Sequence, residues 1–255
     1  MEDYKIILSP AKIMDESPNR SSYQHSIPSF QGQSEKLINK LKRLEEAEIG
    51  ALMSLSPSLQ ELNKNRFQAW KTSRGEEEEL VSIMTFKGEV YRAFEFETLS
   101  KDLYAKLDQK LRILSGLYGV LSPFDLIRPY RLEMGTKLSI SSKEKNLYDF
   151  WKKSLLTYFK DYLKDAVLIN LASNEYFKAI DVKNLKNRVI TPHFKEFKNR
   201  KYQTIMMYAK NARGKMARYL IENELSSIEE MKLFNLDGYQ FDANLSSEND
   251  WVFTR

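Results

Sequence analysis

The chain has 255 residues, of which 42% are hydrophobic, and 40 Lys and Arg stand against 35 Asp and Glu, a formal net charge of +5. This hydrophobic share, with 14 Phe, 14 Tyr and 3 Trp, can fill a sizeable core and excludes global disorder. Cysteine is absent, which excludes disulfides, thiolate catalysis and cysteine-bound zinc or iron–sulfur clusters.

Several classes of protein are not expected from the remaining composition. The first residues, MEDYKIILSPAK, lack a basic segment followed by an apolar one, so we expect no signal peptide. No apolar run approaches the length of a membrane span, and we expect a cytoplasmic protein without membrane contact. His25 and His193 make no convincing metal site, and no Walker A or dinucleotide motif occurs. We therefore expect no metal and no cofactor, and nothing indicates an obligate protein partner.

The first half of the chain predicts strands and helices around a polar loop. Residues 4–8 (YKIIL) predict a buried strand that ends at Ser9-Pro10. Residues 15–33 are rich in Ser, Pro, Asn and Gln and predict a loop, after which Ser34 is expected to cap a helix. We also expect a helix over 59–70 and a strand over 80–86.

The second half of the chain also predicts both helices and strands. An apolar stripe from Leu103 to Leu114 predicts a helix that ends at Gly116, and residues 147–162 predict another helix. The apolar run 166–171 predicts an interior strand. Further elements expected are strands over 188–191 and 203–208 around a basic turn, a helix within 206–224, and short strands in 234–253. Without repeats or a Pro/Gly-rich seam, the pattern predicts one mixed α/β domain over 1–255, with a central sheet surrounded by helices.

Two glycines three residues apart, Gly116 and Gly119, interrupt the apolar pattern of residues 111–135. A helix, a tight glycine hairpin and a second helix would form a helix-hairpin-helix element, whose amides contact the phosphates of one DNA strand. That element usually has one apolar residue between its glycines, whereas here there are two, Leu117 and Tyr118. The alternative is an ordinary helix end followed by a turn.

Basic side chains gather after this motif and in the later helix. Arg128 and Arg131 are close enough in sequence for bidentate anion recognition, although Arg131 could instead pair with Glu133 or Asp125. At about 100° per residue, Lys210, Arg213 and Arg218 fall within an arc of roughly 140°, which is typical of a phosphate track. The alternative for this helix is a solvated face.

Polar residues also follow two of the predicted strands, where ligand sites of α/β folds often lie. Lys12 follows the first strand within SPAK and could bind phosphate or act as a base; the alternative is a simple strand-ending turn. Ser173, Asn174, Glu175 and Lys178 follow the strand predicted over 166–171. The alternative for Ser173 or Asn174 is to cap the next helix.

Taken together, these motifs resemble the bacterial YaaA family of peroxide-stress proteins. The segments that carry the resemblance are SPAK (9–12), FKGEVY (86–91), LSGLYGVLSPFDLIRPYRLEMG (114–135), INLASNEYFK (169–178), AKNARGKMARYLIEN (209–223) and FNLDGYQFD (234–242). The resemblance implies a cytosolic role in the response to hydrogen peroxide that limits damage from intracellular iron. It also implies a mixed α/β fold with a helix-hairpin-helix element and a positively charged cleft that binds DNA.

Mapped onto this chain, the resemblance predicts a protein that binds double-stranded or bent DNA largely without sequence specificity. The expected hairpin is Gly116, Leu117, Tyr118 and Gly119, and charge suggests Arg128, Arg131, Lys210, Arg213 and Arg218 as cleft residues. The alternative is an uncharacterised enzyme that acts on an anionic small molecule. Its expected pocket residues are Lys12, Lys87, Glu133, Asn174, Glu175 and Lys178. An open basic groove would favour DNA, and a closed pocket lined by these residues would favour an enzyme.

Overall fold

The computed structural model describes residues 2–75 and 78–255, and its centre is an eight-stranded mixed sheet. The strands of this sheet are β1 (Tyr4–Leu8), β5 (Leu111–Ser115), β6 (Gly119–Leu121), β8 (Val167–Asn170), β9 (Val189–Lys198), β10 (Lys201–Gln203), β11 (Gln240–Phe241) and β12 (Asp250–Thr254). Their order is β11-β12-β9-β8-β1-β5-β6, with β10 paired to β9. Two small sheets pair β2 (Ile13–Met14) with β4 (Phe86–Lys87) and β3 (Leu80–Val81) with β7 (Leu126–Ile127).

The middle of the large sheet is parallel and buried. Ile6 of β1 lies in register with Leu111 of β5 on one side and Ile169 of β8 on the other. Every residue of β1 and β8 is buried, as expected for parallel strands covered on both faces. Because the chain places β5 on one side of β1 and β8 on the other, the strand order reverses at β1. The carboxyl ends of strands at such a reversal are where open α/β sheets bind ligands.

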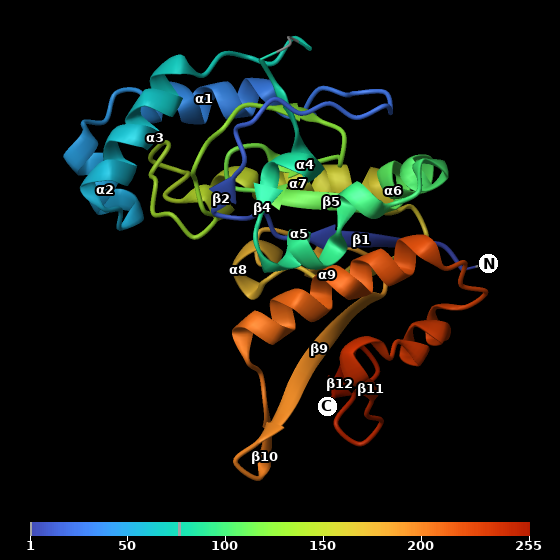
Figure 1. Cartoon of the computed structure of the whole chain (residues 1–255). Coiled ribbons are helices and arrows are strands. Elements are labelled where there is room, and N and C mark those ends of the chain that lie inside the picture. The colour runs from blue at the N-terminus through green and yellow to red at the C-terminus, as the bar shows by residue number, and fades with distance from the viewer. Residues whose placement is uncertain (1, 76–77) are drawn as a thin grey trace.

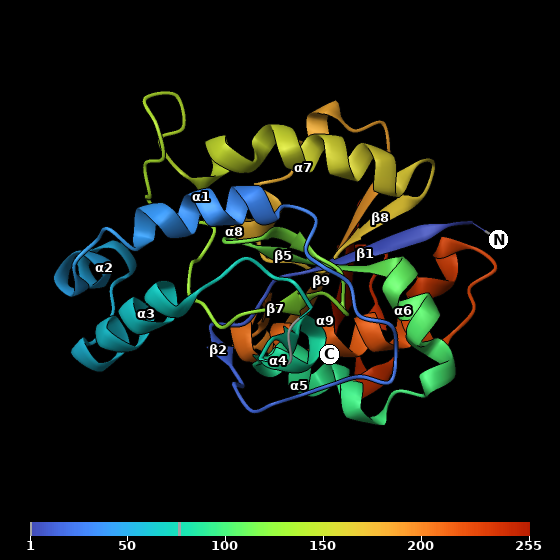
Figure 2. The same ribbon diagram turned by 90° about the horizontal axis from the view of Figure 1, so that it is seen from above.

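Helices cover both faces of this sheet. They are α1 (Gln31–Leu41), α2 (Glu46–Met53), α3 (Pro57–Ala69), α4 (Ser82–Thr85), α5 (Glu89–Phe94), α6 (Tyr104–Lys110), α7 (Leu147–Leu163), α8 (Asn174–Phe177) and α9 (Met206–Glu222), with 3-10 turns at 96–98, 101–103, 182–184, 228–233 and 236–238. Figures 1 and 2 show α7 behind the sheet and α5 and α9 in front of it. None of the helices in the described chain is long and apolar enough to cross a membrane.

The mixed α/β class with a central sheet is confirmed. The strand predicted over 4–8 is β1, and the one predicted over 166–171 contains β8. The helix predicted over 147–162 is α7, where Asn146 caps the first turn by accepting from the Asp149 amide. The sequence predicts these segments correctly because each is marked by one mostly apolar run or by one apolar stripe at helical spacing.

Four element predictions are wrong in part. One is the strand expected over 203–208, because β10 ends at Gln203 and residues 206–208 begin α9. The helix expected to continue to Gly116 ends at Lys110, and Leu111–Ser115 is the interior strand β5. A short apolar run buried on both faces has the same composition in a strand as in a helix, so periodicity could not separate them. The strand expected over 80–86 is two short strands around α4, and the helix expected from Ser34 begins at Gln31.

The helix-hairpin-helix expected at Gly116–Gly119 is also wrong. These residues form the turn of the β5–β6 hairpin, and Leu117 and Tyr118 are 0% and 1% exposed. A Cβ on Gly116 would lie 2.2 Å from the Leu132 carbonyl oxygen, so this turn is pressed against neighbouring backbone. Two helices joined by a short connection occur instead at α2 and α3, where Ser54 has a left-handed φ of 54° and is exposed.

Candidate functional site

A pocket of about 360 Å³ lies where β1 and β8 end, at the reversal point of the sheet. Five cationic side chains line it: Lys12, Lys87, Arg131, Lys210 and Arg213. Three carboxylates line it: Glu89, Glu133 and Glu175. The remaining lining residues are Ser9, Pro10, Ala11, Ile13, Gly88, Val90, Tyr91, Tyr130, Leu132, Leu171, Ser173, Tyr176 and Met206. Cations outnumber carboxylates, which is the composition of an anion site.

The floor of the pocket is built from the two loops that follow β1 and β8. Ser9 Oγ accepts a hydrogen bond from the Ser173 amide (2.8 Å) and lies 3.2 Å from Ser173 Oγ. Tyr91 of α5 donates its hydroxyl to the Ser9 carbonyl (2.8 Å). Burial raises the pKa of Tyr91, so its hydroxyl stays a donor at neutral pH. These bonds fix the strand ends against each other and against α5.

Glu133 neutralises part of the positive charge. Its Oε2 lies 2.7 Å from Lys12 Nζ, and its Oε1 lies 3.3 Å from Arg131 Nη2. Glu175 is held differently, because its Oε1 accepts from the Gly135 amide (2.9 Å). One carboxylate thus bridges two pocket cations, while the other pins the backbone that follows them.

The close packing of α9 against α5 places two more cations over the pocket. A Cβ on Gly214 would lie 2.1 Å from the Val90 carbonyl oxygen, so only glycine allows this approach. Lys210 and Arg213 of α9 line the pocket, and neither side chain hydrogen-bonds or ion-pairs with any residue of the described chain. Burial lowers the pKa of Arg213, yet a guanidinium remains charged at neutral pH.

Two guanidinium nitrogens in the pocket are buried donors without an acceptor. They are Nε of Arg131 and Nε of Arg213, for which the described residues supply no hydrogen-bond partner. A buried donor left without a partner costs about 1–3 kcal/mol. An oxyanion bound between the two arginines would supply the missing acceptors.

The structure joins residues from both sets proposed from the sequence. Arg131, Lys210 and Arg213 of the expected cleft lie in the same pocket as Lys12, Lys87, Glu133 and Glu175 of the expected enzyme site. Asn174 and Lys178 are exposed on and after α8 and are not among the lining residues.

Two arginines of the expected cleft lie elsewhere. Arg128 is buried and pairs with Glu78 and Glu79, at 3.4 and 3.8 Å. Arg218 pairs with Glu222 and donates to the carbonyl oxygens of residues 94, 95 and 98, so it closes the end of α5. Both guanidinium groups are bound by residues of the protein itself, so the prediction that they line the cleft is corrected.

Sequence reasoning missed several lining residues, among them Ser9, Glu89 and Tyr91. Glu89 and Tyr91 follow Lys87 by two and four residues in FKGEVY, but α5 is only six residues long, too short for a periodic pattern to identify. The polar pattern of that motif was the only available signal. Within the described residues, no three His, Asp or Glu side chains gather in a way that could hold a metal ion.

Comparison with known proteins adds an independent finding. Residues 4–245 match the family model of the peroxide stress protein YaaA. The chain is similar to a UPF0246 protein of Flavobacterium johnsoniae, with 44% identity over 252 residues that cover 98% of this chain and all of the relative. UPF0246 proteins of Shewanella sp. strain ANA-3 and Colwellia psychrerythraea are each 44% identical over 253 residues, 98% of both chains.

Proposed function

This chain belongs to the YaaA family of peroxide stress proteins, and we propose that it acts in the cytoplasm by binding DNA through backbone phosphates, largely without sequence specificity. The observation that carries the proposal is the pair Lys210 and Arg213, pocket cations without a partner among the described residues. Phosphate oxygens are strong acceptors for such groups, and phosphate contacts carry no base sequence.

We place the hairpin contact of this proposal at α2 and α3 instead of at Gly116–Gly119. The connection between these helices, residues 54–56, exposes Ser54 and Ser56, and no side chain caps the first turn of α3. Pro57 has no amide hydrogen and the Leu59 amide donates to the Ser56 carbonyl (3.0 Å), so the Ser58 amide is the donor left at this helix start for a phosphate oxygen. The hairpin contact is secondary to the pocket, because the first turn of α2 carries the acidic Glu46 and Glu48.

The same binding accounts for a role in limiting iron-dependent damage. Hydrated Fe²⁺ binds oxygen ligands such as phosphate, and peroxide reacts where the iron is bound. A phosphate that accepts from Arg131 and Arg213 is covered by protein and carries less free negative charge. DNA held in this way should therefore bind less iron.

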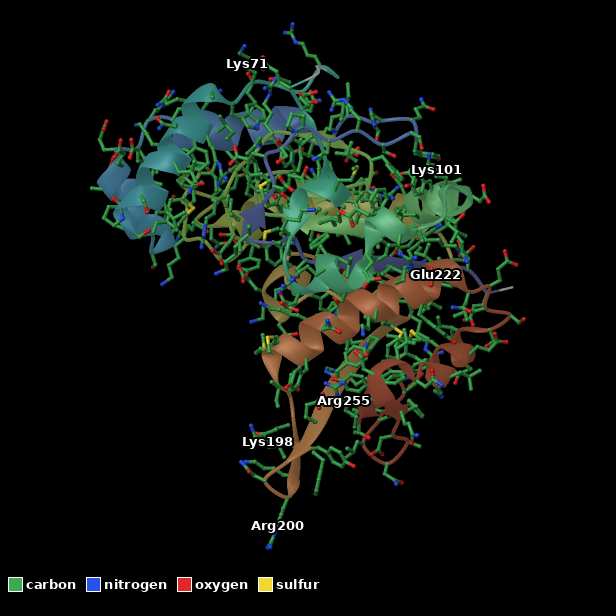
Figure 3. The ribbon with its side chains drawn as sticks, in the orientation of Figure 1. Lys71, Lys101, Lys198, Arg200, Glu222 and Arg255 are labelled. Atoms are coloured by element: carbon green, nitrogen blue, oxygen red, sulfur yellow. The ribbon has the colours of Figure 1, made fainter. Side chains whose placement is uncertain are left out.

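The test is a titration of two labelled duplexes of unrelated sequence at several salt concentrations. We expect similar affinities for both and a steep loss with salt, because each neutralised phosphate contributes about 0.9 to the log–log slope. The double variant Lys210→Gln/Arg213→Gln should bind weakly. The control Lys71→Gln/Lys101→Gln removes the same charge at exposed positions away from α9 and should bind normally (Figure 3). Absent or salt-independent binding by the unmodified protein would refute the proposal.

A second function, an enzyme acting on an anionic small molecule, is favoured by the position of the pocket. It lies at the carboxyl ends of parallel strands where the strand order reverses, and its 360 Å³ is the size of a small-molecule site. Carboxylates beside cations, such as Glu133 beside Lys12, could transfer protons. Calorimetry with inorganic pyrophosphate separates the two functions. Tight binding that excludes duplex DNA would favour the enzyme, whereas weak, salt-sensitive binding would favour DNA.

A further inference from the structure

The hairpin of residues 195–203, here called the arm, lies outside the pocket. We propose that the arm is a binding site for single-stranded nucleic acid, on which unpaired bases stack. This inference deepens the proposed DNA binding and rests on it for the class of ligand. It adds a separate site and a preference for DNA that contains unpaired bases.

The arm is a two-stranded ribbon whose end, residues 198–201, pairs with no other strand of the described chain. Phe197 lies opposite Tyr202, and Lys198 lies opposite Lys201. The last contact of β9 with the C-terminal strand region is the hydrogen bond from the Phe197 amide to the Arg255 carbonyl (2.8 Å). Beyond it the arm projects from the body of the molecule (Figure 1). Figure 3 shows Lys198 and Arg200 at its far end.

The positively charged side chains of the arm have no polar partner within the described chain. Lys195, Lys198, Arg200 and Lys201 form no side-chain hydrogen bond or ion pair with any described residue. The only acidic residue of the arm, Glu196, is occupied by Arg255 and Tyr239. The arm therefore presents four uncompensated positive charges, which complement a polyanion.

Two features of the arm cost folding stability. Like charges directly opposite on neighbouring strands, as in Lys198 and Lys201, are destabilising. The two turn residues, Asn199 and Arg200, have left-handed φ of 54° and 61°, the type I′ pattern, which favours Asn and Gly over Arg. No side-chain hydrogen bond or ion pair of Arg200 within the described chain offsets this cost. A ligand that binds these cations would offset the cost to folding stability.

The aromatic pair identifies the ligand more closely. Phe197 and Tyr202 are 60% and 43% exposed, and their ring centroids lie 5.1 Å apart at an interplanar angle of 60°. Phe197 and Tyr202 share one face of the ribbon, while Lys198 and Lys201 lie on the opposite face. Exposed aromatic rings with unpaired cations along the same ribbon are the composition of a platform for stacked bases. A duplex hides its base faces, and an apolar protein partner would leave the cations unmatched, so a single strand fits best.

The arm is continuous with the pocket. β10 leads through residues 204–205 into α9, whose Met206 and Lys210 line the pocket. A strand lying on the arm thus runs toward the cations proposed to hold phosphate. DNA with unpaired bases next to a duplex would engage both sites.

The experiment compares binding of a labelled single-stranded oligonucleotide and a labelled duplex by anisotropy. Phe197→Ala/Tyr202→Ala should lower single-strand affinity at least about tenfold, because one stacked base contributes that much. Duplex affinity should change little. Leu233→Ala removes another side chain that is 68% exposed and serves as the matched control. Lys198→Gln/Lys201→Gln should reduce the single-strand salt slope by about 1.4, or 0.7 for each phosphate. Melting curves verify that each variant is folded.

A 2-aminopurine base in the single strand provides a second readout, because stacking on an aromatic ring quenches its fluorescence. Quenching that depends on Phe197 and Tyr202 supports the proposal. Unchanged single-strand affinity and quenching in the aromatic variant overturn it, even where Lys210→Gln/Arg213→Gln abolishes duplex binding. The reverse result, loss in the arm variants with normal binding by the pocket variant, retains the arm and refutes the pocket. No binding of either nucleic acid refutes both.

Discussion

Lys12 Nζ lies 2.7 Å from Glu133 Oε2 and so joins the loop after β1 to the segment that follows β7. Because the Lys12 side chain is 61% exposed, solvent screens this pair and it contributes little to stability. Its effect is on the charge of the pocket, since the same carboxylate also pairs with Arg131.

We expect Glu133→Gln to strengthen the binding of duplex DNA at low salt without a clear change in melting temperature. The substitution removes one negative charge from beside two pocket cations and leaves them for the ligand. Anisotropy titrations and thermal melts of both proteins measure this. Weaker binding by a normally folded variant would argue that Glu133 itself contacts the ligand, as in the enzyme hypothesis.

We expect Gly116→Ala to lower the free energy of unfolding by about 1–3 kcal/mol, the usual cost of overpacking. The new Cβ would meet the Leu132 carbonyl oxygen at 2.2 Å, where backbone must shift. Gly32→Ala is the matched control, because nothing lies within 4 Å of its added Cβ, and it should leave stability equal or up to about 1 kcal/mol higher. Urea unfolding of both variants measures the two free energies of unfolding. Equal stabilities would contradict the buried β5–β6 turn.

Arg218→Gln should destabilise the protein and leave DNA binding unchanged. Its guanidinium donates to three carbonyl groups at the end of α5 and in the turn after it, and hydrogen bonds to a charged group contribute about 1.5–3 kcal/mol. Thermal melts test the first part and duplex titrations the second. Reduced DNA affinity with an unchanged melting temperature would instead support the prediction that Arg218 lines the DNA-binding cleft.

Burial raises the pKa of Asp125 to about 6, which makes stability depend on pH. The folded protein keeps this proton between about pH 4 and 6, where the unfolded chain loses it. The stability contributed by this group is therefore greatest below pH 4 and falls, by an amount on the order of 3 kcal/mol, as the pH rises to 6.

Asp125→Asn tests this dependence, because an amide does not titrate. The difference in unfolding free energy between pH 4 and pH 7, measured with urea, should shift in favour of pH 7 in the variant relative to the unmodified protein. The Asn carbonyl can still accept the hydrogen bond from Ser26 that Asp125 accepts at 2.6 Å. The same pH dependence in both proteins would show that Asp125 ionises normally.

The sequence was sufficient where one local pattern determines burial. β1 and β8 are mostly apolar runs that are buried throughout, and α7 has an apolar stripe with a capping Asn146. It was insufficient at Leu111–Ser115, where a strand buried on both faces continues the stripe of the helix before it.

The site shows the same limit. Lys12, Arg131 and Arg213 could each be selected by residue type, but their convergence depends on strand order, which no local pattern encodes. Arg128 resembled Arg131 in sequence, yet its carboxylate partners Glu78 and Glu79 lie some 50 residues earlier in the chain. Whether an arginine is free for a ligand is decided by such distant contacts.

The most direct test of the phosphate-binding pocket compares two arginines of one helix. Duplex affinity is measured against salt concentration for Arg213→Gln and Arg218→Gln, which remove the same charge from α9. The account predicts a lower affinity and a log–log slope smaller by about 0.9 for Arg213→Gln, with the slope of the unmodified protein retained by Arg218→Gln. An Arg213→Gln protein that binds DNA with the affinity and salt slope of the unmodified protein would contradict it.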